Sequence, residues 1–375
     1  MKLGIVGLPN VGKSTLFNAI TGTSNAQAAN YPFCTIDPNV GIVPVPDARL
    51  DKLCEIWEPE KRTAAIVEFV DIAALVKGAS KGAGLGNKFL GNIRQCDAIV
   101  HVVRCFDDEN IVHVVEDATK PVPVDPDADI QCIDTELILS DMEIVEARQN
   151  RAQRNARTNN KEAKAELVWL EKLAAHLGEG KSARTFPFDE KDEAQQAALR
   201  EMGLLSAKPI IYACNMDDDG VADAENNAYY KIVKARADIE HAQVIPICAK
   251  TEEDLSGMDE EEREEFMSAL GLAESGLDRL VKASYTLLGL ISFLTDGKKE
   301  CRAWTIKNGT KAPQAAGKIH SDFERGFIRA QVCAFDTLMA CGGKMSEVKA
   351  RGLYRVEGKD YVVKDGDIIE FLFNV

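Results

Sequence analysis

The sequence lacks several features that would place it in common protein classes. None of its 10 cysteines forms a CxxC pair, so neither a thioredoxin-like redox motif nor a zinc-finger spacing is present. We therefore expect the buried, reduced thiols of a cytosolic protein. No apolar run reaches the roughly 18 residues that a membrane span requires. We expect no membrane partner.

Positive charge is also scarce. The net charge of −15 argues against general nucleic-acid binding. Its distribution is uneven, because residues 286–375 carry 14 Lys and Arg against 11 Asp and Glu and are weakly basic on an acidic chain. On a predicted helix, Arg148, Arg151, Arg154 and Arg157 recur every three residues. They are either a solvated helix surface or a contact for RNA phosphates.

Apolar runs and helical signals alternate through much of the chain. Short buried strands alternating with helices predict a parallel sheet with helices on both faces. The predicted strands are residues 2–6, 65–70, 98–103, 210–213 and 244–247. Gly and Pro are absent from residues 131–177, which predicts a helical insertion between the third and fourth of these strands.

The C-terminal part has a different pattern, with turn residues between short apolar runs. The runs 304–306, 330–332, 361–363 and 368–373 predict strands, and Asp365-Gly366 predicts a hairpin turn. We therefore expect an α/β fold with a P-loop domain, an inserted helical hairpin and a small α+β domain. The expected boundaries are 1–134 with 206–285, then 135–205, and then 286–375.

Residues 7–14 match the pattern GxxxxGK[ST] after a predicted strand and at the start of a helix. In that context the pattern is a P-loop. Gly7 and Gly12 allow the backbone to curl around an anion, so that successive N–H groups point at the phosphates. Lys13 places a positive charge near the β and γ phosphates, and Ser14 offers a hydroxyl to Mg²⁺. The sequence therefore predicts binding of a nucleoside triphosphate.

Two downstream residues complete the predicted metal site. Thr35 is placed like the switch threonine that completes magnesium coordination. Asp71 ends a predicted strand, where its carboxylate can hold a magnesium-bound water. We therefore expect Mg²⁺ at Ser14, Thr35 and Asp71.

The nucleotide base is expected to contact a loop after the fourth predicted strand. GTPases read guanine with the motif Asn-Lys-x-Asp, and this chain has Asn215, Met216 and Asp218 at the first, second and last positions. Met216 departs from the guanine-reading motif, whereas Asp218 keeps it. Ala249 and Lys250 resemble the loop that contacts the base through its backbone. These residues alone leave ATP and GTP as alternatives.

With these residues in view, the chain resembles the Obg-like ATPases, the YchF subfamily of P-loop NTPases. The resemblance covers the chain from end to end. It rests on residues 7–15, 30–36, 69–73, 75–82, 101–106, 302–305, 320–330 and 371–375. It implies a nucleotide-binding domain, an inserted helical hairpin and a C-terminal TGS domain of the β-grasp-like type.

The resemblance also implies partners. It implies that ATP is preferred and GTP is weaker, although this chain carries Asp218 where the subfamily carries Glu. It implies binding to the ribosome or its large subunit. Contacts to rRNA or tRNA would come from the four arginines of the predicted helix and from the TGS domain.

Roles for single residues follow from the same resemblance. The nucleotide-binding residues would be Asn10, Val11, Gly12, Lys13, Ser14, Thr15, Asn215, Met216, Asp218, Ala249 and Lys250. Leu75 stands where many GTPases carry the glutamine that positions water, and the resemblance points to His113 for this task, with Lys13 as the second catalytic residue. Asn10 lies where related enzymes use asparagine to bind K⁺.

Three functions are compatible with these observations. The first, which we expect, is an ATPase switch whose nucleotide state changes its affinity for a ribosomal partner. The second is a slow GTPase of the Obg class, in which Asp218 reads guanine. The third is a nucleotide-binding module with negligible turnover. Ala74 favours this third function, because it replaces a switch glycine and restricts φ.

Overall fold

The structure is a computed structural model that describes residues 1–27, 39–73, 85–108, 123–157 and 160–374. The chain divides into two compact units. Among the described residues, the first unit contains 1–26, 39–41 and 68–280, and the second contains 27, 42–67 and 281–374. A search of the described helices finds none with the length and hydropathy that crossing a membrane requires.

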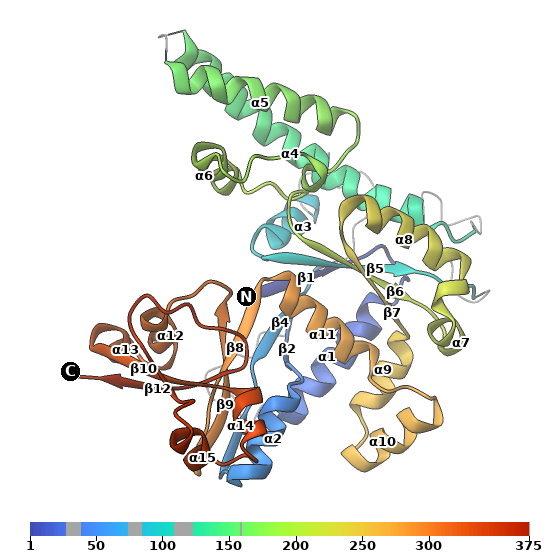
Figure 1. Cartoon of the computed structure of the whole chain (residues 1–375). Coiled ribbons are helices and arrows are strands. Elements are labelled where there is room, and N and C mark those ends of the chain that lie inside the picture. Colours follow the sequence, from blue (N-terminus) through green and yellow to red (C-terminus); the bar gives the residue numbers. More distant parts are fainter. Residues whose placement is uncertain (28–38, 74–84, 109–122, 158–159, 375) are drawn as a thin grey trace. The chain divides into compact units, whose positions relative to one another are not determined.

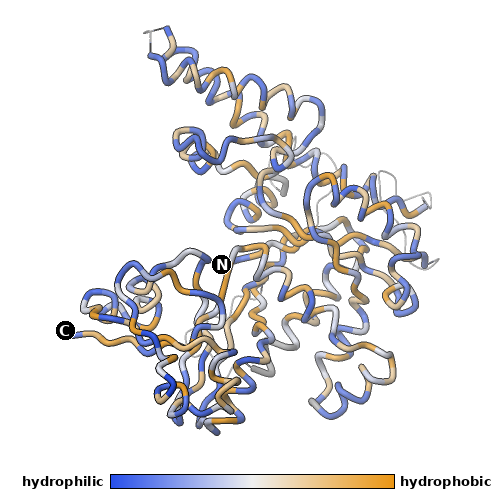
Figure 2. Tube along the Cα trace, viewed as in Figure 1, coloured by the Kyte–Doolittle hydropathy of each residue, from blue (hydrophilic) through white to orange (hydrophobic). Residues whose placement is uncertain are grey.

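The first unit is built on a six-stranded sheet with the order β2-β4-β1-β5-β6-β7 (Figure 1). Its strands are β1 (Lys2–Val6), β2 (Val40–Pro44), β4 (Ile66–Asp71), β5 (Ala98–Arg104), β6 (Ile210–Asn215) and β7 (Gln243–Ile247). From β4 to β7 every neighbouring pair is parallel. All residues of β5 and β6 are buried, and the central strands of this sheet are largely orange in Figure 2. The predicted parallel sheet is confirmed, because continuous apolar runs are typical of strands that are covered on both faces.

Helices of the first unit follow most of these strands. They are α1 (Lys13–Gln27), α3 (Leu85–Arg94), α4 (Pro126–Ala156), α5 (Lys161–Gly178), α6 (Glu193–Met202), α7 (Asp218–Ala222), α8 (Ala228–Glu240), α9 (Ala249–Ser256), α10 (Glu260–Ala269) and α11 (Gly276–Leu287), which continues into the second unit. Two short 3₁₀ helices, Ala183–Thr185 and Ala224–Asn226, lie between them. The carboxyl ends of β1, β6 and β7 therefore each lead to the start of a helix, which is where ligands bind in such sheets.

The predicted helical insertion is present as α4 and α5, which pack side by side (Figure 1). Their contact is apolar, with Val145 of α4 and Leu170 and Leu173 of α5 in one buried cluster. Helix α4 begins before the expected boundary at 134/135, because Asp125 caps its N-terminus and Pro126 occupies its first turn. The position of that domain boundary stays a prediction.

The second unit contains a second six-stranded sheet, in the order β11-β10-β12-β8-β9-β3. Its strands are β3 (Lys61–Thr63), β8 (Leu290–Thr295), β9 (Glu300–Lys307), β10 (Phe327–Ala334), β11 (Arg355–Glu357) and β12 (Asp367–Phe373). Its helices are α2 (Ala48–Trp57), α12 (Ala312–Ile319), α13 (Ser321–Arg325), α14 (Phe335–Ala340) and α15 (Met345–Ala350). Phe293, Val332 and Phe371 lie in its main core. The predicted α+β class of the C-terminal part is confirmed.

Residues 42–67 belong to this second unit, although they precede most of the first unit in sequence. Strand β3 pairs in parallel with β9, with Arg62 opposite Cys301. The hydroxyl of Thr63 donates to Oε1 of Glu300 at 2.5 Å. A three-residue strand with no apolar alternation carries no sequence signal, so this pairing could not be predicted.

The expected strand at 361–363 and the hairpin at Asp365-Gly366 were wrong. Val362 forms only an isolated bridge with Lys311, and β12 pairs with β10 and β8 instead. Gly366 does adopt a positive φ of 80°. The turn is held to β8, because the Ser292 amide donates to Oδ1 of Asp365 at 2.8 Å and the Gly366 amide donates to the Ser292 carbonyl at 2.9 Å.

Candidate nucleotide-binding site

The P-loop connects β1 to α1, and its backbone curls as the motif requires. Asn10 and Gly12 have positive φ values of 64° and 90°. A Cβ atom at Gly12 would collide with the side-chain amide of Asn215, and one at Gly7 would lie 2.9 Å from the carbonyl oxygen of Val102. Only glycine fits at these two positions, and a backbone that curls in this way is the one whose amides can point at an anion.

Lys13 and Asp71 meet in this site although 58 residues separate them in sequence. The ammonium of Lys13 forms an ion pair with Oδ1 of Asp71. Strand pairing brings them together, because β1 and β4 are adjacent with Ile5 opposite Asp71. The Lys13 side chain is 8% exposed and the Asp71 side chain 26%. A buried cation beside a half-buried carboxylate can bind both phosphate and a divalent cation.

The neighbours of Lys13 differ in exposure. Ser14 is exposed and Thr15 is half-buried, whereas Val11 is buried. Both Ser14 and Thr15 lie in the first turn of α1, whose free amides favour an anion. Four other residues of the predicted site lie outside the described residues: Thr35, Ala74, Leu75 and His113.

Asn215, at the end of β6, joins the P-loop to the loop after β7. Its Nδ2 donates to the Val11 carbonyl at 2.9 Å, and its Oδ1 accepts from the Ala249 amide at 3.0 Å. The residue is buried, so both bonds are made away from bulk solvent. A side chain predicted to contact the base therefore also holds the two loops of the site together. The spacing of the motif in sequence carries no signal for this second role.

Met216 and Asp218 follow Asn215 but have different environments. Met216 is buried, and its amide donates to the Ile247 carbonyl at 2.9 Å. Asp218 is the exposed first residue of α7, and its Oδ1 accepts from the hydroxyl of Thr251 at 2.5 Å. The sequence carries no signal for Thr251, because a lone threonine after Cys248-Ala249-Lys250 has no distinctive pattern. Lys250 itself is exposed.

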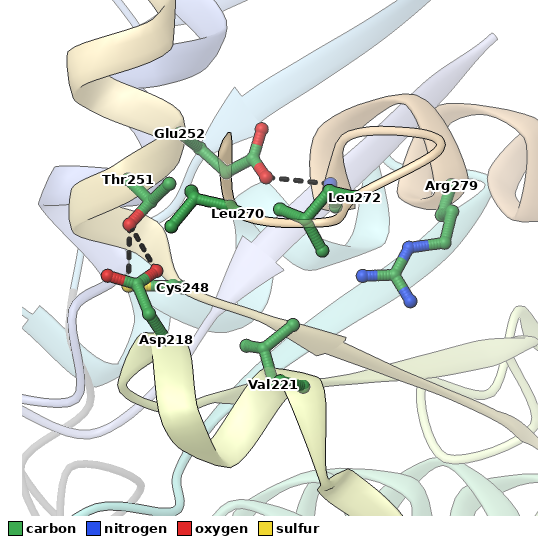
Figure 3. Close-up of a pocket in the computed structure, with 10 residues that line it drawn as sticks. Asp218, Val221, Cys248, Thr251, Glu252, Leu270, Leu272 and Arg279 are labelled. Carbon is green, nitrogen blue, oxygen red and sulfur yellow. Dashed lines mark hydrogen bonds between the residues drawn. The ribbon is translucent and has the colours of Figure 1, made fainter. Parts of the chain in front are cut away.

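A small cavity of about 30 Å³ lies beside Asp218 and Thr251 (Figure 3). Its wall combines polar groups with Val221, Leu270 and Leu272. The thiol of Cys248 lies 3.2 Å from Oγ1 of Thr251, and burial raises the pKa of that thiol. The cavity is too small for a base, so the base would have to lie on the open side of Asp218.

The four arginines of the predicted helix lie on α4, and the structure divides them. Arg148 forms two ion pairs within the helical insertion: its Nε lies 2.6 Å from Oε1 of Glu166, and its Nη1 lies 2.7 Å from Oε2 of Glu201. Arg151, Arg154 and Arg157 are exposed. Arg148 is thus poorly placed to contact a phosphate, because its partners would have to be replaced.

Comparison with known proteins gives consistent matches over the whole chain. A family model described as 50S ribosome-binding GTPase matches residues 2–125, and a YchF GTPase C-terminal model, described as a protein of unknown function, matches residues 290–374. The "Ribosome-binding ATPase YchF" of Bacillus subtilis is 54% identical over 372 residues, covering 99% of each chain.

A relative with the same name from Escherichia coli O157:H7 is 51% identical over 374 residues, covering 100% of this chain and 99% of that protein. Among solved structures, the YchF GTPase of Schizosaccharomyces pombe superposes with a TM-score of 0.86 at 39% identity. It covers 99% of this chain and 97% of its own. The likeness extends over both compact units.

Proposed function

This chain belongs to the YchF family, and from that membership we propose that it is an ATP-binding and ATP-hydrolysing switch protein that associates with the ribosome through the large subunit. Relatives that are about half identical over their full length are named ribosome-binding ATPases. The observation that carries the proposal is the Lys13–Asp71 pair at the glycine cradle of the P-loop. We also retain the division into nucleotide-binding domain, helical insertion and TGS domain as a proposal.

The phosphates would bind to the loop from Asn10 to Thr15. Backbone amides of the loop and of the first turn of α1 donate to phosphate oxygens, and the Lys13 ammonium neutralises the β and γ phosphates. The ammonium is already held at the carboxylate of Asp71, which keeps it at the foot of the loop. Lys13 therefore binds substrate and stabilises the charge that develops during transfer.

The residues of the site fit Mg²⁺. The exposed hydroxyl of Ser14 and the carboxylate of Asp71 are oxygen ligands of the type that this ion prefers, and both lie at the cradle that only glycine can form. Together with Thr35 they would hold it. When bound, Mg²⁺ supplies positive charge that offsets the charge on the phosphates. Asn10 is proposed as a K⁺ ligand, and this role is abandoned if replacing K⁺ by Na⁺ leaves the hydrolysis rate unchanged.

The attacking water needs an orienting group, and we assign this to His113. Leu75 has no side-chain donor or acceptor, so it cannot orient water. A histidine can accept a proton near neutral pH. A His113→Ala variant that retains ATP affinity but loses hydrolysis supports the assignment. An unchanged hydrolysis rate in this variant would contradict the assignment of His113.

ATP is proposed as the preferred nucleotide. Met216 is buried where guanine readers carry a lysine over the base. The second candidate function is an Obg-type GTPase, because Asp218 is the residue that guanine-reading motifs carry at this position. Calorimetry with ADP and GDP separates the two, because neither ligand is hydrolysed. Tighter binding of GDP would favour the GTPase.

Ribosome binding would use the exposed arginines of α4 and the weakly basic second unit. Cosedimentation of the chain with ribosomes in ATP and in ADP tests whether nucleotide changes the affinity. Charge reversal of Arg151, Arg154 and Arg157 should weaken binding, whereas reversal of Lys161, Lys164 and Lys172, which are exposed on α5, is the matched control. Equal binding of both variants would exclude α4 as the contact. Turnover that is undetectable with and without ribosomes would favour a binding module.

A further inference from the structure

Three aromatic rings lie together in the second unit, where α13 packs against β12 (Figure 1). The Phe323 and Phe373 rings stack, with centroids 3.8 Å apart and planes 25° from parallel. The His320 ring follows, with its centroid 6.4 Å from that of Phe323. Phe373 is 39% exposed although Phe323 covers one face of its ring. The exposed surface of Phe373 therefore belongs to the other face and the edge of the ring.

A bulge in β10 adds an apolar and a cationic side chain to the exposed surface of this unit. The pairing of β10 with β12 places Phe327 opposite Phe373 and Arg329 opposite Leu372, so the ladder skips Ile328. As a result Ile328, at 55%, and Arg329 are exposed in succession. Arg329 makes no ion pair within the part of the chain that the structure describes. An exposed apolar group and an unpaired guanidinium thus lie within two residues of the position opposite Phe373.

The charges around the rings favour an anionic partner. Residues 318–329 contain three Lys and Arg and two Asp and Glu, which is a net charge of +1 on a chain of net charge −15. Asp322 forms an ion pair with Arg325, which offsets its charge. The remaining carboxylate, that of Glu324, is outnumbered by Lys318 and the arginine of the bulge, which are both exposed.

Exposed rings beside unpaired cations match the chemistry of single-stranded RNA. An unpaired base offers a flat face that stacks on an aromatic side chain, and its backbone brings phosphates to nearby cations. The bases of a duplex are already stacked on one another and cannot use such rings. Residues 320–330 and 371–375, which supply the rings, lie in the second unit and outside the residues proposed for nucleotide binding.

We propose that His320, Phe323 and Phe373 form an aromatic platform on which an unpaired RNA base stacks, and that Arg329 binds a flanking phosphate. This inference rests on the proposed function, because it names the chemistry by which the second unit contacts the ribosome. Phe373 touches the base. Phe323 and His320 lie behind its ring and are positioning residues.

The first test measures RNA binding by the unmutated, full-length chain. Fluorescence anisotropy gives the Kd values of a short oligouridine and of an abasic strand with the same number of phosphates. Stacking of a base on the platform should make oligouridine bind about tenfold tighter than the abasic strand. Annealing the oligouridine to oligoadenosine should weaken binding, because its bases are then no longer free. Equal Kd values for oligouridine and the abasic strand, or tighter binding after annealing, would overturn the proposal.

The second test compares Phe373→Leu with Phe373→Tyr. Leucine keeps an apolar side chain but removes the ring, so oligouridine binding should weaken by about tenfold. Tyrosine keeps the ring, and its Kd should stay within about twofold of that of the unmutated chain. Val356→Ala on β11, where the side chain is 59% exposed, is the matched control for the loss of an exposed apolar group. A Phe373→Leu chain that binds oligouridine as tightly as Val356→Ala overturns the role of the ring.

A third variant tests the phosphate contact at an exposed position where folding is not at risk. Arg329→Gln should reduce the slope of log Kd against log salt concentration by about 0.7, the contribution of one phosphate contact to a single strand. Phe373→Leu should leave this slope unchanged, because it removes stacking and no charge. An unchanged slope in Arg329→Gln contradicts the assignment of Arg329.

Cosedimentation with ribosomes separates this inference from the proposed function. If the unmutated chain does not cosediment, ribosome association and the inference fail together. If it cosediments and Phe373→Leu cosediments equally, the proposed function stands and the aromatic platform is removed. If Phe373→Leu loses ribosome binding but keeps its affinity for oligouridine, this surface contacts a protein, and the proposal is overturned.

Discussion

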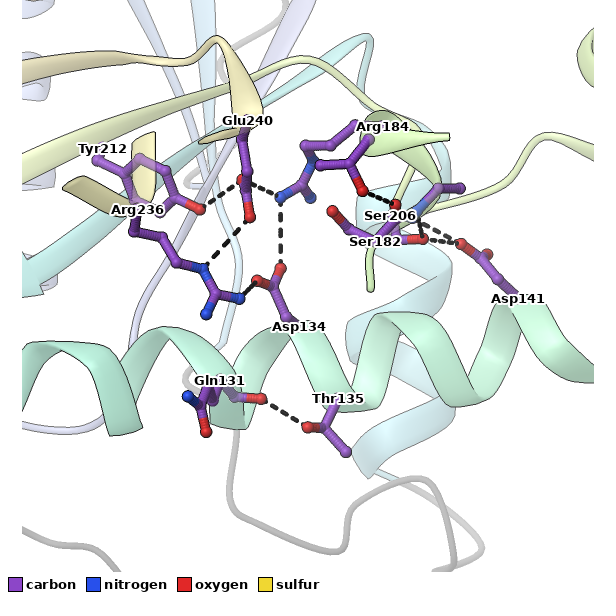
Figure 4. A network of polar contacts seen from close by, with 12 residues as sticks. Gln131, Asp134, Thr135, Asp141, Ser182, Arg184, Ser206, Tyr212, Arg236 and Glu240 are labelled. Carbon is purple, nitrogen blue, oxygen red and sulfur yellow. Dashed lines mark hydrogen bonds and ion pairs between the residues drawn. The ribbon is translucent and has the colours of Figure 1, made fainter. Parts of the chain in front are cut away.

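Replacing Asp134 by asparagine should destabilise the first unit by several kcal/mol. Asp134 on α4 belongs to a quartet with Arg184, Arg236 and Glu240, in which only Arg236 is partly exposed, at 22% (Figure 4). Arg184 lies 2.8 Å from Glu240 and 3.4 Å from Asp134, and Arg236 lies 2.8 Å from Asp134. Tyr212 of β6 donates to Glu240 at 2.8 Å. The quartet therefore ties the helical insertion to α8 and to the nucleotide-binding sheet.

The expected loss of stability in Asp134→Asn follows from the burial and the charges of these side chains. The side chains of Asp134, Glu240 and Arg184 are 3%, 4% and 6% exposed. Burial disfavours the charged form of the Arg184 guanidinium, but the negative charges of Asp134 and Glu240 outweigh this effect and raise the pKa of Arg184 above its ordinary value. The four charges sum to zero, so Asp134→Asn leaves Glu240 as the one carboxylate of the quartet, shared by Arg184, which is 6% exposed, and Arg236, which is 22% exposed. Breaking a buried pair in this way costs about 3–5 kcal/mol.

Urea unfolding measures this loss. Trp169 on α5 reports on the first unit, because the other two tryptophans, Trp57 and Trp304, lie in the second unit and can be changed to phenylalanine. Asp127→Asn is the matched control, since Asp127 also pairs with Arg236 at 3.4 Å but is 43% exposed. Asp127→Asn should lower the free energy of unfolding by less than about 1 kcal/mol.

A double variant separates charge from packing. Combining Asp134→Asn with Arg236→Gln restores neutrality, so its cost should fall below the sum of the single costs by about 1–3 kcal/mol. The reasoning is refuted if Asp134→Asn costs no more than Asp127→Asn, or if the double variant is strictly additive.

Three further predictions concern the site and its surroundings. Lys13→Ala should weaken ATP binding by about 100-fold in calorimetry, because a charge-assisted phosphate contact is lost, and unchanged affinity would contradict its role. Asn215→Ala should lower the free energy of unfolding by about 1–3 kcal/mol and also weaken ADP binding, because it leaves the Val11 carbonyl and the Ala249 amide without their partner. Burial, and then the charge of Asp125, raise the pKa of Asp129 to about 7. The folded chain thus keeps a proton that the unfolded chain releases near pH 4, so stability falls as pH rises from about 4 to 7. Asp129→Asn should remove this slope and raise the urea midpoint at pH 8, and an unchanged slope would count against it.

Much of the site could be predicted because its signals are local. The P-loop pattern specifies glycines, a lysine and a hydroxyl within eight positions, and the apolar run before it specifies a buried strand. Asp71 could be placed near Lys13, since parallel strands end at the same edge of a sheet. The contact between Thr251 and Asp218 could not, because each residue is ordinary in its own segment and only the packing of α7 against α9 brings them together.

The same distinction explains the errors in the second unit. Asp365-Gly366 does form a turn with a positive φ, as its local chemistry requires. Which strands the turn joins depends on hydrogen bonds to Ser292, about 70 residues earlier in the chain. Strand β3 is assigned to the second sheet by pairing with β9, which no property of residues 61–63 indicates.

The sequence by itself determined the parallel strands β1 and β4 to β7, the phosphate-binding loop and the family. These depend on periodicity, turn chemistry and motif spacing, which act over a few residues. Only the tertiary structure decided that Arg148 forms ion pairs with Glu166 and Glu201. It also decided that Asp134, Arg184, Arg236 and Glu240 form a quartet without net charge. It brought the Thr251 hydroxyl to one oxygen of Asp218. These depend on which side chains meet across elements, and pairwise contact energies over long separations leave no pattern in the chain order.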